Sequence, residues 1–354
     1  MHDTGALKVD CASPGEMALV KSAGFKSSDI IYANTMKSDA DLELALEQGF
    51  RCTTTDSVEG VQQIVSQFNS FETKPIIVRL AVDDRQSRSP FSIKFGAKED
   101  EWIPIMNAIR LRGLKFGGLS FHVGSASSDP NSFVNAIRQC RRFQERIGCE
   151  LDVVDIGGGF LPYEDSFRRV ADGIRKEMWN WAIAGGSPKE WIAEPGRFFS
   201  SPLQTLLCPI VFKKVSADRV RYILDDSVYG QFSSIVFDHS RPHWTVLSRR
   251  TLLRTGKQAL FFGKTCDSLD LIAMQKEAPE YEVGDVFVFP FMGAYTSASA
   301  TTFNGFALPQ KYYLEDERFT ANHCLQKLFD AQEQQPGIEF PIETKSNISL
   351  SAQL

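Results

Sequence analysis

A run of three glycines in the middle of the chain has the composition of a phosphate-binding turn. Gly157, Gly158 and Gly159 follow directly after the apolar stretch 153–156. Because glycine has no Cβ, a strand that runs into such a turn leaves backbone N–H groups open to an anion. Glycine-rich turns after strands are common, so an ordinary turn is the alternative interpretation.

The tetrapeptide EPGR at 194–197 brings a carboxylate and a guanidinium together after another apolar stretch. A carboxylate such as Glu194 could hold a ring nitrogen in its protonated form. Gly196 and Arg197 could bind a phosphate, since the arginine forms charge-assisted hydrogen bonds with phosphate oxygens. The residue types in this tetrapeptide therefore suit a ring nitrogen and a phosphate.

Two later segments add a thiol and a group of polar side chains. GKTCDSLD at 263–270 places Cys266 beside a carboxylate, and GAYTSASATTFNGF at 293–306 gathers small, polar and aromatic residues. Each candidate has a plainer alternative. Cys266 could be a structural thiol, His122 a core histidine and Tyr295 a packing residue.

Short apolar segments that alternate with amphipathic ones must position these side chains. Up to about residue 200 they predict repeated strand–helix units around a parallel sheet. The predicted strands are 30–33, 51–54, 75–81, 118–122, 151–156 and 190–194, and the predicted helices are 39–48, 58–68, 131–147 and 166–181. Polar residues recur at the predicted strand ends, among them Asn34, Arg79 and His122. This favours a barrel, because the carboxyl ends of barrel strands converge on one site.

The residue pattern of the chain changes after Pro202. Runs rich in β-branched and aromatic residues dominate, and helical patterns become scarce. The predicted strands are 211–215, 221–225, 259–263 and 286–289. We therefore expect a barrel over residues 1–204 and a largely β domain over residues 205–354.

Composition limits the class of protein. The 354 residues carry a net charge of −5 and no basic run, which argues against a nucleic-acid partner. The seven cysteines include no CxxC pair and no metal-ligand spacing, so we expect no metal site and a reduced, cytoplasmic protein. Neither a signal peptide nor a membrane span is predicted.

Motifs spread over nearly the whole chain resemble one family, the eukaryotic ornithine decarboxylases and their relatives. Those motifs are VDCAS (9–13), IIYAN (30–34), IKFGA (93–97), SFHVGS (120–125), DIGGGF (155–160), AEPGRFF (193–199), DDSVYGQF (225–232), FDH (237–239), TCDSLD (265–270) and MGAYTSASATTFNGF (292–306). The resemblance implies a pyridoxal 5'-phosphate enzyme of fold type III. Its fold would be an alanine-racemase-like α/β barrel, here N-terminally shortened, plus a C-terminal β domain.

The resemblance also implies roles around the cofactor. The three glycines, with Gly196 and Arg197, would bind its phosphate. Glu194 would pair with the pyridine nitrogen, and His122 would stack on the ring. The other implied contacts are the hydroxyls of Ser125 and Tyr295, together with Asp10, Arg79 and Pro195.

On the substrate side, the resemblance implies a basic amino acid, with L-ornithine converted to putrescine and carbon dioxide. Asp238 and Asp267 would bind the distal ammonium group, and Cys266 would protonate the α-carbon. Phe237 stands where many family members have tyrosine, which removes one hydroxyl. The family's Cys-Asp segment enters the site from a second subunit, so a homodimer with shared active sites is implied.

One family feature has no counterpart in this sequence. The Schiff-base lysine of the family lies in a motif like YAVK, upstream of the segment that matches VDCAS, and only residues 1–9 precede Asp10 here. We therefore expect the first barrel strand to be missing. Three interpretations stay open: a decarboxylase whose first segment is absent from this sequence, a non-catalytic homologue that binds an antizyme as antizyme inhibitors do, and a decarboxylase in which Lys8 replaces the lysine. We favour descent from a working decarboxylase, because the cofactor-binding residues are retained.

Overall fold

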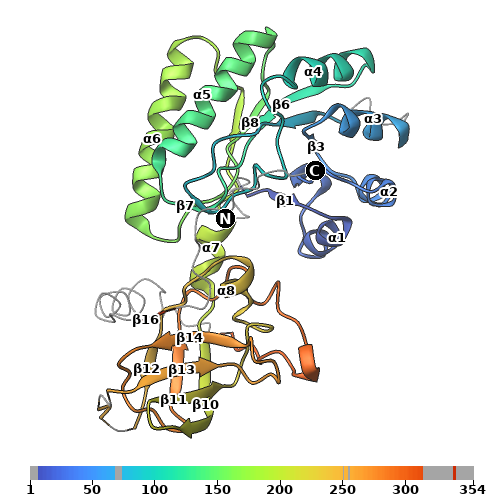
Figure 1. The fold of residues 1–354 in the computed structure, drawn as a ribbon. Helices are drawn as coiled ribbons and strands as arrows, with labels where there is room; N and C mark the ends of the chain where they lie inside the picture. The colour runs from blue at the N-terminus through green and yellow to red at the C-terminus, as the bar shows by residue number, and fades with distance from the viewer. Residues whose placement is uncertain (1–6, 68–73, 250, 254–255, 314–337, 340–354) are drawn as a thin grey trace, which may run out of the picture. The chain divides into compact units, whose positions relative to one another are not determined.

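The structure is a computed structural model, and it describes residues 7–67, 74–249, 251–253, 256–313 and 338–339 (Figure 1). The chain forms two compact units, residues 1–196 and 197–354. The domain border predicted at 204/205 falls a few residues beyond this division and stays a prediction. Among the described residues, no helix is long and apolar enough to cross a membrane.

The first unit is built on a curled sheet of seven parallel strands, in the order β1-β2-β3-β4-β6-β8-β9. The strands are β1 Val9–Cys11, β2 Ile30–Tyr32, β3 Cys52–Thr55, β4 Ile76–Arg79, β6 Phe116–Ser120, β8 Val153–Asp155 and β9 Glu190–Ile192. Ile31, Cys52, Ile77 and Val153 pack together as one apolar cluster between neighbouring strands. The predicted barrel-type α/β fold is confirmed, with the sheet as a half-barrel.

Helices alternate with the strands and cover one side of the sheet (Figure 1). They are α1 Pro14–Ser22, α2 Asp39–Gln48, α3 Val58–Gln67, α4 Trp102–Leu111, α5 Pro130–Ile147 and α6 Glu164–Ile183. Helix α5 has clear start and stop signals. At its start, the side chain of Asp129 accepts a hydrogen bond from the N–H of Asn131, and Pro130 is the first helical residue. At its end, Gly148 adopts the left-handed conformation.

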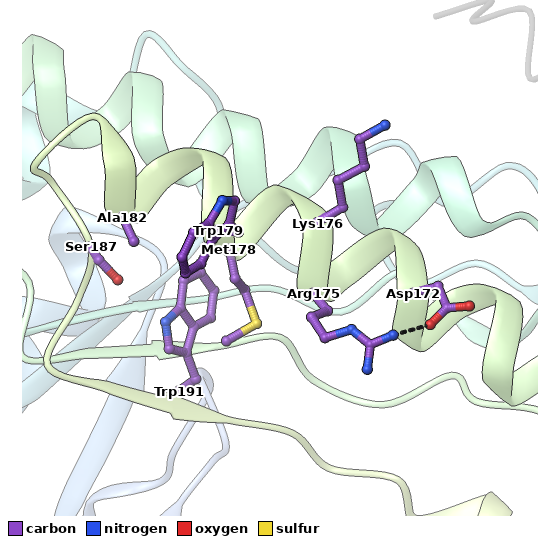
Figure 2. Close-up of a pocket in the computed structure, with 8 residues that line it drawn as sticks. All are labelled: Asp172, Arg175, Lys176, Met178, Trp179, Ala182, Ser187 and Trp191. Atoms are coloured by element: carbon purple, nitrogen blue, oxygen red, sulfur yellow. Dashed lines mark hydrogen bonds and ion pairs between the residues drawn. The ribbon is translucent and has the colours of Figure 1, made fainter.

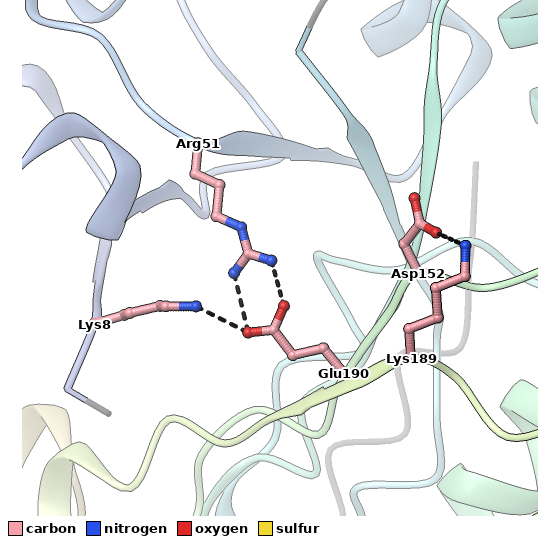
Figure 3. Close-up of polar contacts among 5 residues, drawn as sticks. All are labelled: Lys8, Arg51, Asp152, Lys189 and Glu190. Carbon is pink, nitrogen blue, oxygen red and sulfur yellow. Dashed lines mark hydrogen bonds and ion pairs between the residues drawn. The ribbon is translucent and has the colours of Figure 1, made fainter. Parts of the chain in front are cut away.

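An ion-pair cluster links the two edge strands of this sheet (Figure 3). Nζ of Lys8, just before β1, lies 2.9 Å from Glu190, the first residue of β9, and Arg51 also binds Glu190 through Nη1 and Nη2 of its guanidinium. These hydrogen bonds, the one from Arg51 above all, lower the pKa of Glu190 to about 2. The cluster thus brings residues 182 positions apart in sequence together at the amino ends of the strands.

The second unit is a mostly antiparallel sheet in the order β12-β15-β10-β11-β13-β14-β16, so the predicted β domain is confirmed. Its strands are β10 Leu206–Val215, β11 Arg219–Leu224, β12 Thr245–Leu247, β13 Gln258–Phe262, β14 Leu271–Gln275, β15 Val286–Phe289 and β16 Ile338–Glu339. Trp244, Phe261 and Phe287 form an aromatic core with centroid separations of 5.3 to 5.8 Å. Short helices α7 Gly196–Ser200 and α8 Ser233–Phe237 precede and interrupt the strands.

Candidate active site

The carboxyl ends of the parallel strands bring the predicted polar residues of the first unit to one edge of the sheet. Arg79 ends β4, His122 follows β6, and Glu194 follows β9. Asp155 ends β8 and was not singled out from the sequence, although its place at a strand end directly before the glycines is a usable signal.

Three carboxylates gather at this edge. Burial raises the pKa of Glu194 well above its usual value, and repulsion from Asp155 and Asp10 raises it further. The pKa of the buried Asp155 is also raised, mainly by burial, and the two carboxyl groups share a hydrogen bond. Asp10 on β1 is exposed and adds a third negative charge. A cation bound here would relieve this repulsion.

Arg79 is the guanidinium that faces these carboxylates. It is half-buried, and its central carbon lies 4.9 Å from the centre of the Phe95 ring. Desolvation lowers its pKa, while Glu194, Asp56 and Asp155 act in the opposite direction. Because arginine stays charged in proteins, one positive charge meets three acidic groups, and the site retains a preference for a further cation.

His122 is held as a neutral imidazole. The N–H of Gly124 donates to its Nδ1 at 3.0 Å, which leaves the ring proton on Nε2. Burial, and then the positive charge of Arg79, lower its pKa to about 3. The ring of Phe91 lies 4.8 Å away, centre to centre. A neutral, flat ring in this place can stack on another aromatic ring.

The glycine turn joins His122 and Glu194 into one site. Gly157 adopts a φ of 62°, and a Cβ there would lie 2.2 Å from the carbonyl oxygen of Phe121. A Cβ on Gly158 would lie 2.7 Å from the carbonyl oxygen of Glu194 and 3.0 Å from Nε2 of His122. Only glycine permits this close approach of three chain segments.

The backbone of this turn retains free donors. The N–H of Gly157 donates to Asp155 at 2.9 Å, so it is not free for a phosphate. The N–H groups of Gly158 and Gly159 have no acceptor in the part of the chain that the structure describes, although both residues are buried. Buried N–H groups normally have partners, so an anion fits here. Together with the acidic cluster, this matches a group that carries a phosphate and a protonated ring nitrogen.

Three further predicted residues lie near the turn in sequence or in the sheet. Ser125 is buried on β7 (Ser125–Ser127), a short strand paired with β5 (Ser87–Ser89). Pro195 is half-buried next to Glu194, and the N–H of Gly196 donates to the carbonyl of Glu194 at 2.7 Å. Among the described residues no group of His, Cys, Asp and Glu could hold a metal ion.

In the second unit, Arg197 and Asp238 bind each other. Their side chains are 8% and 7% exposed, and Nη2 of Arg197 donates to Oδ1 of Asp238 at 2.6 Å. The guanidinium also lies 4.7 Å from the centre of the Tyr295 ring, and Tyr295 has a positive φ of 55°. The predicted phosphate ligand, the predicted substrate ligand and the predicted hydroxyl are therefore neighbours.

The thiol segment forms a second group in this unit. The hydroxyl of Tyr229 donates to Asp267, and its ring stacks on Phe303 at 4.2 Å. Cys266 is exposed, and its N–H donates to the side chain of Asn304 at 3.1 Å. Tyr229 lies in the DDSVYGQF motif, and the sequence assigns it no role of its own. Phe237, at 72% exposure, lies next to Asp238 in sequence.

Three lysines of the first unit, Lys8, Lys37 and Lys94, each contact another group of that unit. Lys8 binds Glu190 at the amino ends of the strands, whereas Glu194 follows the carboxyl end of β9. The contact of Lys8 with Glu190 therefore argues against the alternative in which Lys8 replaces the family lysine. Buried Lys37 donates to the carbonyl of Thr54 at 2.6 Å, and Nζ of Lys94 lies 4.8 Å from the ring centre of Phe95.

A separate open pocket of about 690 Å³ lies along α6 (Figure 2). Trp179 and Trp191 line it, with Arg175 and Lys176 at its side. It includes none of the predicted site residues, so the candidate site is elsewhere.

Two family models match the chain. The pyridoxal binding domain of pyridoxal-dependent decarboxylases matches residues 1–201, and the C-terminal sheet domain of the same enzymes matches residues 153–293.

Individual relatives agree with these matches. Ornithine decarboxylase of Schizosaccharomyces pombe is 36% identical over 322 residues, which cover 87% of this chain and 72% of the relative. The Caenorhabditis elegans enzyme of that name is 33% identical, covering 87% of this chain and 76% of the relative. Among solved structures, the Paramecium bursaria Chlorella virus arginine decarboxylase bound to agmatine is 31% identical with a TM-score of 0.79, covering 87% and 84% of the two chains. The lysine/ornithine decarboxylase of Vibrio vulnificus complexed with cadaverine is 31% identical with a TM-score of 0.76, covering 87% and 82%.

Proposed function

Because this chain belongs to the family of pyridoxal-dependent decarboxylases, we propose that it converts L-ornithine to putrescine and carbon dioxide. As a family member it is a lyase that uses pyridoxal phosphate to decarboxylate a basic amino acid. The choice of ornithine rests on the similarity to ornithine decarboxylases.

One observation carries the proposal for the site: the acidic cluster and the free N–H groups flank His122. Glu194, supported by Asp155, would hold the protonated nitrogen of the cofactor ring, which offsets the repulsion between the two carboxylates. Gly158 and Gly159 would bind the phosphate, together with Ser125, Gly196, Arg197 and Tyr295. When bound, the cofactor draws electrons from the bond that breaks at the α-carbon.

His122 would keep its neutral ring against one face of the cofactor. Its Nδ1 is fixed by Gly124 and its low pKa prevents it from gaining a charge, so its orientation does not change between pH 5 and 8. Arg79, Asp10 and Pro195 complete the proposed cofactor contacts. Arg79 would limit the excess negative charge around Glu194.

For the substrate, the second unit offers two carboxylates in different states. Asp238 already binds Arg197, whereas Asp267 accepts a hydrogen bond from the neutral hydroxyl of Tyr229. Asp267 is therefore the carboxylate with more charge left for the distal ammonium group, with Asp238 and Phe237 beside the substrate. Cys266, which is exposed and adjacent to Asp267, would donate the proton to the α-carbon.

We also infer a homodimer in which Cys266 and Asp267 complete the partner's site, and a cytoplasmic location. The six cysteines of the described part are unpaired, which supports a reducing compartment.

Release of labelled carbon dioxide from carboxyl-labelled amino acids tests the activity. Purified protein with added pyridoxal phosphate is expected to release label from ornithine faster than from lysine or arginine. Glu194→Gln is the negative control, because glutamine cannot carry the charge that holds the ring nitrogen. If label is released only from lysine or only from arginine, that amino acid is the substrate in place of ornithine. No release from any of the three, with co-precipitation of an antizyme, would replace the proposal by the regulatory function.

A further inference from the structure

A segment that follows β4 and precedes α4 crosses the sheet edge next to His122, and Asp84 fixes its first part. Asp84 is 1% exposed. Its Oδ2 accepts hydrogen bonds from the N–H groups of Phe91 and Ser92 at 2.5 and 2.7 Å, and its Oδ1 accepts from the Ser92 hydroxyl at 2.5 Å. One buried carboxylate thus closes a loop over residues 84–92.

The middle and the end of the segment are also attached to the site. Strand β5 pairs with β7, so that Ser89 lies opposite Ser125. The N–H of Gly96 donates to Asp56 at 2.8 Å, and the N–H of Ala97 donates to the carbonyl of Arg79 at 2.8 Å. The segment is therefore tied to β7, to β4 and to Asp56 after β3.

This segment carries two aromatic rings onto the site. The ring of Phe91 lies 4.8 Å from that of His122, and the ring of Phe95 lies 4.9 Å from the guanidinium carbon of Arg79. The carbonyl of Phe91 accepts from the N–H groups of Lys94 and Phe95, both at 3.0 Å, so the two rings belong to one tight turn. The hydrogen bonds of Asp84 that hold Phe91 in place therefore also position Phe95.

We propose that Asp84 is a positioning residue for the cofactor site, because it holds the Phe91 ring 4.8 Å from the His122 ring at a tilt of 54° and so fixes the orientation in which His122 meets the cofactor. The inference deepens the proposed function and rests on the stacking role of His122. A carboxylate suits the task, since two of its three bonds are to backbone N–H groups and bonds to a charged acceptor are strong. Asparagine would remove the charge from the oxygen that accepts both N–H groups, and its NH₂ group would replace the oxygen that accepts from the Ser92 hydroxyl.

The neighbouring residue provides a matched control. Asp83 is exposed, binds the side chain of Arg85 and accepts a hydrogen bond from the Arg85 N–H at 3.2 Å, but it makes none of the contacts to Phe91 and Ser92. Asp83→Asn therefore removes the same charge one residue away and leaves Phe91 in place.

The first measurement uses protein without cofactor. In ¹³C-labelled histidine NMR spectra, His122 of the wild type is expected not to titrate between pH 5 and 8, since its pKa is about 3 through burial and the charge of Arg79. Asp84→Asn frees Phe91 and admits water, so His122 is expected to titrate in this range. His122→Gln assigns the signal among the five histidines.

The second measurement is the affinity for pyridoxal phosphate, followed by tryptophan fluorescence. Asp84→Asn is expected to weaken binding by about tenfold, the effect of one lost bond to a charged group. Phe91→Leu is expected to weaken it similarly, and Phe91→Tyr to restore it. Asp83→Asn is expected to match the wild type in both measurements.

Two results would overturn the inference: His122 still silent in Asp84→Asn, or an affinity change no larger than in Asp83→Asn. If Asp84→Asn does not fold, the same test is made with Phe91→Leu. A His122 that does not titrate between pH 5 and 8 in that variant would also overturn the inference. Unchanged cofactor affinity in His122→Gln would instead refute the stacking role of His122, while the NMR titration would still judge Asp84.

Discussion

At the scale of single residues, the site is defined by charge that the protein itself does not balance. Arg79 faces Glu194 and Asp155, Asp10 repels both of these carboxyl groups, and protonation is one way to relieve the repulsion. A bound ring cation is another. The stability of cofactor-free protein should therefore depend on pH through this cluster.

Replacement of Glu194 by glutamine should reveal this dependence. An unfolded glutamate loses its proton near pH 4.5, whereas folded Glu194 keeps its proton to higher pH. The folded state then binds more protons above pH 4.5, so the free energy of unfolding falls as the pH rises. The Tm of cofactor-free wild type should fall more between pH 5 and 8 than that of Glu194→Gln. Equal slopes in thermal unfolding would contradict the assignment.

Gly158→Ala should damage the site through sterics alone. Its new methyl group would lie 2.7 Å from the carbonyl of Glu194 and 3.0 Å from His122, so the turn must shift. We expect cofactor affinity to fall by tenfold or more. Gly15→Ala is the control, because its methyl group would meet nothing closer than 3.7 Å. An equal affinity in both variants, measured by fluorescence titration, would refute the role of the turn.

At this scale, sequence alone predicts many residues of the candidate site, while other contacts of the candidate site cannot be predicted from it. The glycines, His122 and Glu194 follow strands, and their types suit a phosphate and a ring. The contact of Phe91 with His122 joins segments that run antiparallel through β5 and β7, and no local pattern indicates such a pairing. The pairing of Arg197 with Asp238 is hidden for the same reason, since 41 positions separate them.

At the scale of elements, the edges of the half-barrel depend on the cluster around Glu190. Strands β1 and β9 each have one strand neighbour in the sheet. Lys8 and Arg51 both reach the same carboxylate, so this one side chain contacts the ends of three strands.

Glu190→Gln should loosen this contact. We expect a loss of about 1 kcal/mol, since Glu190 is one-third exposed and solvent screens the pair. The pKa of folded Glu190 is lowered to about 2, so its contribution is present above pH 4.5 and is lost as the pH falls toward 2.

The neighbouring pair Lys189–Asp152 provides the control, because its atoms lie 2.8 Å apart at an exposed position (Figure 3). Asp152→Asn should change the free energy of urea unfolding by less than Glu190→Gln. A larger effect in Asp152→Asn would show that the edges do not depend on Glu190.

Among the elements, the long periodic ones follow from the sequence. Helix α2 has the predicted bounds, and α5 and α6 differ from theirs by a few residues at the ends. Helix α4 and strand β14 were not predicted. In α4, Pro104 interrupts the helical pattern, although proline costs little in a first turn, where N–H groups have no helical acceptor.

At the scale of the whole molecule, the residues proposed for the cofactor and those proposed for the substrate fall largely in different units. Glu194 and His122 belong to the first unit, and Cys266 and Asp267 to the second. A shared site in a homodimer would combine a first unit from one copy with a second unit from another.

Mixing two inactive variants tests this arrangement. Glu194→Gln and Cys266→Ala should each lose most activity alone. In a shared-site dimer assembled at random, half of the dimers are mixed and each has one intact site, so activity should recover to about a quarter of the wild type. If native mass spectrometry shows mixed dimers but the decarboxylase activity of the mixture does not rise, both residues belong to one subunit's site.

The exposure of Cys266 has a practical consequence. Among the six cysteines of the described part it is the exposed one, and Cys11, Cys52, Cys140 and Cys208 are buried, with pKa values raised by desolvation. The seventh cysteine, Cys324, lies outside the described residues, so in a Cys324→Ser variant a maleimide dye at low excess should attach mainly to Cys266. The protein thus provides its own labelling position, next to Asp267, from which ligand arrival could be followed by fluorescence in real time.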